Sequence, residues 1–281
     1  MTESPIDVWI KQAIPAGSGR YYALLHSKNP SQTSAVLTLI SIWSKLCFSN
    51  REIDAAKKQV EWWQSELSGT DPRHPVTQQL HTSLAGNASS HTTIARLEEI
   101  LDGYGTLVTQ GSPSRETPNH QFHRRTGAVA ALALSLPKTT QSAPNIEAVG
   151  IALSRFRCIR HLHKHAANGL MCMPYEEMES SKISPKDWVP GNYTSNMKSF
   201  LRSQLNSISV QLDESLPLLP AESPDDSFIF IYAQLQHRLL SKIQKEVQAL
   251  DQADIRLSPL RNFWTAHSAA RQHRKMCAAP D

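Results

Sequence analysis

The amino-acid sequence predicts an all-α protein, because helical periodicity recurs along the chain and signals for β-structure are scarce. In residues 52–67 and 228–250, apolar side chains return every three to four residues, as on one face of a helix. No segment reads as an alternating strand bounded by hairpin turns. The 281 residues include only 11 glycines, which leaves few positions for tight β-turns. We therefore expect a single helical domain over 1–281, with its core at about 15–271.

The expected helices have ordinary start and stop signals. Asp71 and Pro72 end the pattern of residues 52–67, and Pro224 with a polar cluster precedes the pattern of residues 228–250. Further helices are expected at about 31–48, 75–87, 91–109, 120–136, 145–167 and 193–212. Stretches rich in proline and serine predict loops at 110–118, 137–145, 180–192 and 215–226. Frayed ends are expected near 1–10 and 272–281.

Composition and charge exclude several classes of protein. Hydrophobic residues make up 40% of the chain and charged residues 19%, which argues against disorder. The net charge is only +4, and basic residues are not interleaved with aromatic residues along any segment, so nucleic acid is not an expected partner. The sequence has no apolar run long enough for a transmembrane helix, and its four separated cysteines suit reduced thiols. We expect a cytoplasmic protein, and the composition permits peripheral contact with a membrane.

Three ordered segments resemble the squalene/phytoene synthase family. GSGRYYALLH at 17–26 precedes an apolar helix and then AAKKQVEWWQSEL, which ends near the His-Pro of DPRHP at 71–75. The stretch at 149–174, VGIALSRFRCIRHLHKHAANGLMCMP, is similar to the family segment that carries an acidic D-x-x-x-D motif. RLSPLRNFWTAHSAAR at 256–271 is similar to the closing helix of the family. The resemblance implies an isoprenoid-synthase-like helical bundle around a central apolar cavity.

Active members of this family join two prenyl diphosphates, with Mg²⁺ held by two facing acidic motifs. Registration of the first motif puts Lys45, Leu46 and Ser49 at its aspartate positions, and His161 and His165 occupy those of the second. Mg²⁺ prefers carboxylate oxygens, and neither imidazole nor ammonium replaces them. We therefore expect no cofactor and no standard Mg²⁺-dependent condensation. Mg²⁺ is expected only if the chain is an active transferase.

Two metal alternatives stay open. Glu52 and Asp54, just downstream of the first motif, would supply carboxylates only after a shift of register. His161 and His165 are four residues apart, so on a helix they share a face as paired transition-metal ligands do. A third ligand would have to come from elsewhere in the chain: His120, His123 or Cys172.

Direct binding of an anion is the alternative that the basic residues favour, because guanidinium groups pair with phosphate without a bridging cation. The second motif forms a basic helix segment of Arg155, Arg157, Arg160, His161, Lys164 and His165. Lys45 adds a positive charge from the first motif. Tyr21 and Tyr22 coincide with family positions near the cavity, as ligand contacts or as core aromatics. Arg20 stands where the family usually has an aromatic residue, which changes the cavity entrance.

The sequence thus predicts a diverged family member with no assigned catalytic residue. The expected substrate-binding residues are Tyr21, Tyr22, Lys45, Arg157, Arg160, His161 and His165. The main hypothesis is a protein that binds an isoprenoid or another lipid with an anionic head group, or that helps a partner protein to assemble. One alternative is an active prenyltransferase with an altered diphosphate site. Another is a structural protein whose cavity is filled with side chains.

Overall fold

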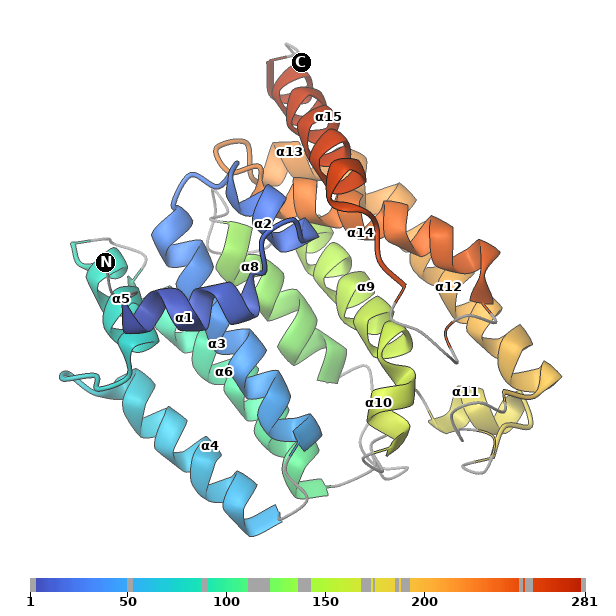
Figure 1. Ribbon diagram of the computed structural model, residues 1–281, viewed down its shortest axis with the longest axis horizontal. Helices are drawn as coiled ribbons and strands as arrows, with labels where there is room; N and C mark the ends of the chain where they lie inside the picture. The colour runs from blue at the N-terminus through green and yellow to red at the C-terminus, as the bar shows by residue number, and fades with distance from the viewer. Residues whose placement is uncertain are drawn as a thin grey trace.

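Helices alone build the part of the chain that the computed structural model describes (Figure 1). That part comprises residues 4–49, 53–86, 90–110, 122–135, 143–167, 173, 175–184, 187, 193–247, 250 and 255–278. The prediction of an all-α protein is confirmed. One connected hydrophobic core runs through these helices, from Ala13 near the N-terminus to Ala270 near the C-terminus.

The long helices lie within a few residues of their predicted positions. They are α3 (Pro30–Ser49), α4 (Ile53–Ser68), α5 (Pro75–Leu84), α6 (Ser90–Gln110), α9 (Pro144–Arg160), α12 (Ser195–Ser215) and α14 (Phe228–Lys245). The predicted helix at 120–136 is a π-helical turn, η1 (Arg124–Ala128), followed by α8 (Val129–Ser135). The short helices are α2 (Gly19–Leu24), α10 (Leu162–Ala167) and α11 (Tyr175–Ser180). The predicted helix 145–167 is interrupted at His161, between α9 and α10.

The described residues near both ends of the chain are more ordered than the sequence predicts. Helix α1 (Pro5–Ala13) starts with a proline in its first turn and packs against α3 and α5. Helix α15 (Pro259–Ala278) continues well past residue 271. Its buried side includes the small residues Ala266, Ala269 and Ala270, which allow close packing against α14, and the last buried residue is His273. The prediction of frayed ends was therefore wrong for residues 5–10 and 272–278.

The predicted loop at 215–226 contains helical turns, η3 (Leu216–Leu218) and α13 (Leu219–Glu222). Leu216, Leu219 and Pro220 are buried and hold these turns against the core. The segment ends at Asp226, whose Oδ1 accepts a hydrogen bond of 2.8 Å from the Phe228 amide at the start of α14. Two of the prolines that suggested a loop, Pro217 and Pro220, lie in the first turns of these helical pieces, where no amide donor is required.

The corner between α4 and α5 is organised by one buried carboxylate. The Oε1 atom of Glu66 accepts hydrogen bonds from the amides of Arg73 and His74, at 2.7 and 2.6 Å. It also accepts a hydrogen bond of 2.6 Å from the Thr77 hydroxyl. Burial alone would raise the pKa of Glu66, but these hydrogen bonds lower it, so the carboxylate stays ionised. Glu66 therefore has a structural role between two helices that the sequence correctly placed.

No helix in the described ranges combines the length and the apolar character that crossing a bilayer requires.

Candidate functional site

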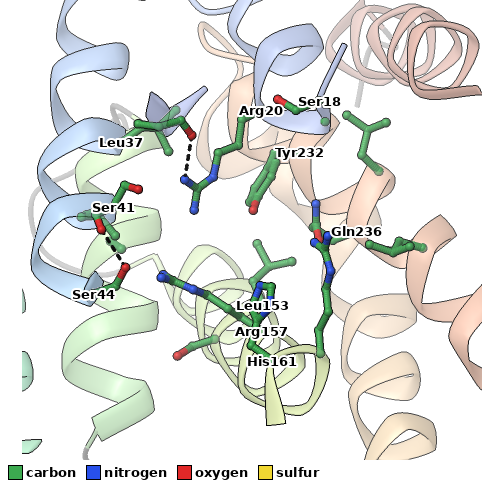
Figure 2. A pocket seen from close by; sticks show the side chains of 18 of the residues that line it. Ser18, Arg20, Leu37, Ser41, Ser44, Leu153, Arg157, His161, Tyr232 and Gln236 are labelled. Atoms are coloured by element: carbon green, nitrogen blue, oxygen red, sulfur yellow. Dashed lines mark hydrogen bonds between the residues drawn. The ribbon is translucent and has the colours of Figure 1, made fainter. Parts of the chain in front are cut away.

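A cavity of about 990 Å³ lies among α2, α3, α8, α9, α10, α14 and the start of α15. Helix α8 lines it with Ala130, Ala131 and Leu134, and α14 adds Leu235 and Leu239. Figure 2 shows polar side chains from α2, α3 and α9 pointing into the same space, together with Tyr232 and Gln236 of α14. The cavity is therefore apolar along α8 and part of α14, and it is polar where α2, α3, α9 and the rest of α14 border it.

A close crossing of two glycines sets the position of α9 at this cavity. A Cβ atom on Gly127 of η1 would lie only 2.5 Å from the carbonyl oxygen of Gly150 in α9. It would also lie 2.7 Å from the Cβ atom of Ser154. Both glycines line the cavity, so the backbones touch where any other residue would separate them. This contact brings the face of α9 that follows Gly150 against the cavity.

The lining residues of α9 and α10 recur every three to four positions, so they form one continuous face. They are Gly150, Leu153, Ser154, Arg157, Arg160, His161, Lys164 and His165. The helix breaks at His161, whose φ and ψ are −107° and 20°. The His165 amide still donates to the His161 carbonyl at 3.0 Å, so α10 continues the same face beyond the break.

Helix α3 presents its own face to the cavity: Leu37, Ile40, Ser41, Ser44 and Lys45. Lys45 lies where the sequence placed it, together with two hydroxyl groups. The Ser44 hydroxyl donates to the Ser41 carbonyl at 2.9 Å (Figure 2). Leu46 is instead partly buried against the core, and the side chain of Ser49 lies outside the described residues.

Positive charge dominates the described lining of the cavity. Six residues carry a cationic side chain: Arg20, Lys45, Arg157, Arg160, Lys164 and Arg256. No aspartate or glutamate is found among the described lining residues. Burial in a medium of low dielectric strengthens the field of such charges, so the cavity attracts anions and repels cations.

Tyr232 lies at the centre of this charge (Figure 2). Burial alone would raise the pKa of its phenol, but the charge and hydrogen bond of Arg20, with the charges of Arg157 and Arg160, lower it. Arg20 also donates to the Ala13 carbonyl at 3.2 Å, and Arg157 donates to the Tyr104 hydroxyl at 3.4 Å. Three guanidinium groups thus approach one buried phenol, in a cavity whose described lining includes no carboxylate.

His165 is uncharged at neutral pH. Burial lowers its pKa to about 3, and the positive charges of Arg157, His163 and Lys164 contribute to the shift. Its ring centroid is 6.4 Å from that of His161, so the predicted pair does share one face. His123 lies near α9 as well, but its Nδ1 is hydrogen-bonded to the Ser154 hydroxyl at 2.9 Å.

The residues at the two motif positions do not fit Mg²⁺. Mg²⁺ requires hard oxygen ligands, usually carboxylates, whereas the described residues at these positions are Lys45, Leu46, His161 and His165, which offer an ammonium group, an alkyl group and two imidazoles. No group of three His, Cys, Asp or Glu residues able to hold a metal ion occurs in the described ranges. Of the other predicted ligands, His120, Cys172 and Glu52 lie outside those ranges, whereas Asp54 lies on α4 away from the cavity.

The predicted site residues divide into two groups. The residues that line the cavity are Lys45, Arg157, Arg160, His161 and His165. Tyr21 and Tyr22 are not among the described lining residues; Tyr21 is exposed, and Tyr22 packs against Phe263 of α15 at 5.9 Å between ring centroids. Arg155 points to α12, where it donates to Gln204 at 2.8 Å.

Sequence reasoning assigned no site role to Tyr232 or Arg256. Tyr232 belongs to the regular apolar stripe of α14, which reads as core. Arg256 carried no signal beyond its charge. For Arg20 the signal existed, because a cation replaces an aromatic residue at that position.

The chain was compared with known families, proteins and structures. The model of the squalene/phytoene synthase family matches residues 49–261, which is well over half of the chain. A crystal structure of a dehydrosqualene synthase in complex with ligand superposes with a TM-score of 0.68 at 11% sequence identity. The match covers 96% of this chain and 94% of that chain. No curated protein sequence matches. Sequence family and fold agree, and the chain belongs to the squalene/phytoene synthase family.

Proposed function

We propose that this protein binds an isoprenoid or similar lipid with a diphosphate-like head group directly, without a metal ion. The observation that carries the proposal is the convergence of Arg20, Arg157 and Arg160 on Tyr232, in a cavity whose described lining contains no carboxylate. Clustered positive charge in a cavity creates a potential that attracts anions. A diphosphate head group would accept charge-assisted hydrogen bonds from these guanidinium groups.

The distribution of polarity supports an amphiphilic ligand. Arg20, Arg157 and Arg160 gather around Tyr232, where they are able to donate several charge-assisted hydrogen bonds to one head group. Helices α8 and α14 supply apolar walls suited to a hydrocarbon chain. The neutral imidazole of His165 leaves the charge of this region to the arginines and lysines.

The same charges count against the metal-dependent condensation of active family members. The described lining provides no carboxylate for Mg²⁺, and its cations repel a divalent ion. We therefore derive no reaction step for this chain. An active transferase with an altered diphosphate site is retained as an outcome of the experiment below.

The test is equilibrium dialysis of the full chain with farnesyl diphosphate in EDTA, with farnesol as the uncharged comparison. We expect farnesyl diphosphate to bind in EDTA and farnesol to bind far more weakly. Arg157→Met should weaken binding of the diphosphate about 10- to 100-fold, because hydrogen bonds to charged groups contribute about 1.5–3 kcal/mol. The matched control is Arg202→Met, on the exposed side of α12 and outside the cavity lining.

Two results would contradict the proposal. Binding that requires Mg²⁺, with release of diphosphate from farnesyl diphosphate above background, would establish the transferase alternative. Failure of the wild-type chain to bind either compound would favour a structural role for the fold.

A further inference from the structure

A second feature lies outside the cavity, on the surface formed by α2 and α15. Of the ten large hydrophobic side chains that are exposed in the described residues, five occur here: Tyr21, Leu25, Leu260, Phe263 and Trp264. The other five are distributed over α1, α4, α12 and η3. We call these five residues the aromatic surface.

The aromatic surface is continuous across the two elements. Tyr21 and Tyr22 lie 5.3 Å apart between ring centroids, Tyr22 and Phe263 lie 5.9 Å apart, and Phe263 and Trp264 lie 5.4 Å apart. Leu25 follows Tyr21 by four residues, and Leu260 precedes Trp264 by four, so each pair shares one helix face. The exposed fractions of Leu260 and Trp264 are 66% and 58%, which is high for residues of their kind.

Helix α15 carries basic residues on the same side. At about 100° per residue, its aromatic residues and most of its basic residues fall within a sector of about 120°. This sector holds Leu260, Phe263, Trp264, His267, Arg271, Arg274 and Lys275. The opposite side holds the buried residues Asn262, Ala266, Ala269, Ala270 and His273. In Figure 1, α15 extends beyond the other helices at its C-terminal end, so its basic half is not covered.

No negative charge balances these cations within the helix. Arg261, Arg271, Arg274 and Lys275 are all exposed, and α15 contains no aspartate or glutamate. Arg274 also acts on His26, the residue next to Leu25. The pKa of His26 is lowered by burial, then by the charge of His267, and then by the charge of Arg274. Aromatic and basic groups thus occur together at the junction of α2 and α15.

We infer that this surface docks the protein on a membrane that contains anionic lipids. Tryptophan and tyrosine favour the boundary between head groups and acyl chains, and exposed lysine and arginine are attracted to anionic head groups. A helix with an aromatic, basic outer face lies in the plane of that boundary, with its apolar side chains inserted. Neither the aromatic residues nor the basic residues would suffice alone for stable docking, and α15 carries both.

The charge pattern argues against a second copy of the chain as the occupant. In a symmetric dimer through this face, the same cations would meet across the interface and repel one another. An anionic bilayer complements every charged residue that the face of α15 exposes.

The docking surface adjoins the cavity without sharing side chains with it. Asn262 lines the cavity and donates to the Gly17 carbonyl at 2.9 Å, which ties α15 to the segment before α2. None of the five residues of the aromatic surface lines the cavity. Membrane docking and ligand binding are therefore separable by mutation, and docking does not depend on the proposed ligand.

The test is co-sedimentation of the full chain with vesicles of phosphatidylcholine alone or mixed with phosphatidylglycerol. We expect binding only to the mixed vesicles, and less binding at high salt. Arg271→Gln with Lys275→Gln should lower the partition coefficient about 30-fold, since each cation contributes about 1 kcal/mol near an anionic surface. Phe263→Ala with Trp264→Ala should lower it about tenfold or more, through lost apolar burial.

Matched controls lie on α4, where Trp62 and two lysines are also exposed. Trp62→Ala, and Lys57→Gln with Lys58→Gln, should bind vesicles as the wild type does. Equal loss in these controls, or absence of wild-type binding to mixed vesicles, would overturn the inference. A change from dimer to monomer in light scattering of the Phe263→Ala, Trp264→Ala variant would instead identify a second copy as the occupant. Farnesyl diphosphate binding should be retained in all of these variants.

Discussion

Three arginines around Tyr232 define the chemistry of the cavity at the scale of single residues. Arg20, Arg157 and Arg160 all lower the pKa of the Tyr232 phenol against the effect of burial. The surrounding described lining contributes further cations and no carboxylate. Burial alone would lower the pKa of Arg157, but the charges of Tyr104 and Tyr232 and the hydrogen bond to Tyr104 raise it, so the folded protein favours the charged guanidinium.

Arg157→Met should therefore weaken both stability and binding. Without ligand, the variant should lower the free energy of unfolding by about 1 kcal/mol, because it removes a buried hydrogen bond to the Tyr104 hydroxyl. Urea unfolding of both proteins measures the change. A variant more stable than the wild type would mean that repulsion from Arg20 and Arg160 outweighs these contacts. Arg202→Met, on the exposed side of α12, should change stability little.

His165 predicts a dependence of stability on pH. Its pKa is lowered to about 3 in the folded protein by burial and nearby positive charge, from a usual value of 6.5. Above pH 6.5 the imidazole is neutral in both states. Between about pH 6.5 and about pH 3 only the unfolded state takes up the proton, so the free energy of unfolding decreases as the pH is lowered.

The measurement is urea unfolding of wild type and His165→Gln at neutral pH and at about pH 5. At the lower pH the wild type should lose about 2 kcal/mol more than the variant, since each pKa unit corresponds to about 1.36 kcal/mol. Equal losses in both proteins would show that His165 is protonated in the folded state. Lowered pKa values of His26, His74 and His273 act in the same direction in both proteins and cancel in the comparison.

At the scale of elements, the crossing of η1 and α9 decides which face of α9 meets the cavity. The Gly127–Gly150 contact has no room for a side chain on either partner. Arg157 and His161 follow Gly150 on the same face, so their position depends on this contact. Close backbone contacts of this kind resist substitution because both helices would have to move.

Gly150→Ala should therefore destabilise the protein by about 2–3 kcal/mol, in the upper part of the range for overpacking. The added Cβ atom would lie 2.8 Å from the Cα atom of Ala128. Gly19→Ala is the control, because a Cβ atom there would meet its nearest neighbour, Gln236 Nε2, at an ordinary 3.6 Å. Urea midpoints of the two variants compare the positions directly. A Gly150→Ala variant as stable as the control would contradict this account of the crossing.

Over the whole molecule, local patterns predicted more of the helices than of the site. Helical periodicity located α3, α4 and α14 because apolar spacing and helix geometry belong to the same short segment. It also placed His161 and His165 on one face. Tyr232 was interpreted as core because its place in the α14 stripe says nothing about the groups that approach it from α2 and α9.

The positions of Tyr21 and Tyr22 also could not be predicted from local patterns. Tyr21 and Tyr22 are expected near the cavity by resemblance, yet the described lining does not include them. Tyr21 is exposed, and Tyr22 packs against α15. The packing of α2 on α14 and α15 decides which side of this short helix faces inward, and it turns Arg20 to the cavity.

The sequence by itself determined the helical class, the family and the replacement of both acidic motifs, because residue identity and periodicity are local properties. The tertiary structure decided that Arg20, Arg157 and Arg160 converge on one buried phenol. It also decided that the described lining of their cavity contains no carboxylate. Electrostatic energies depend on burial and on distances between segments far apart in the chain, and neither quantity is encoded in the spacing of residues along it.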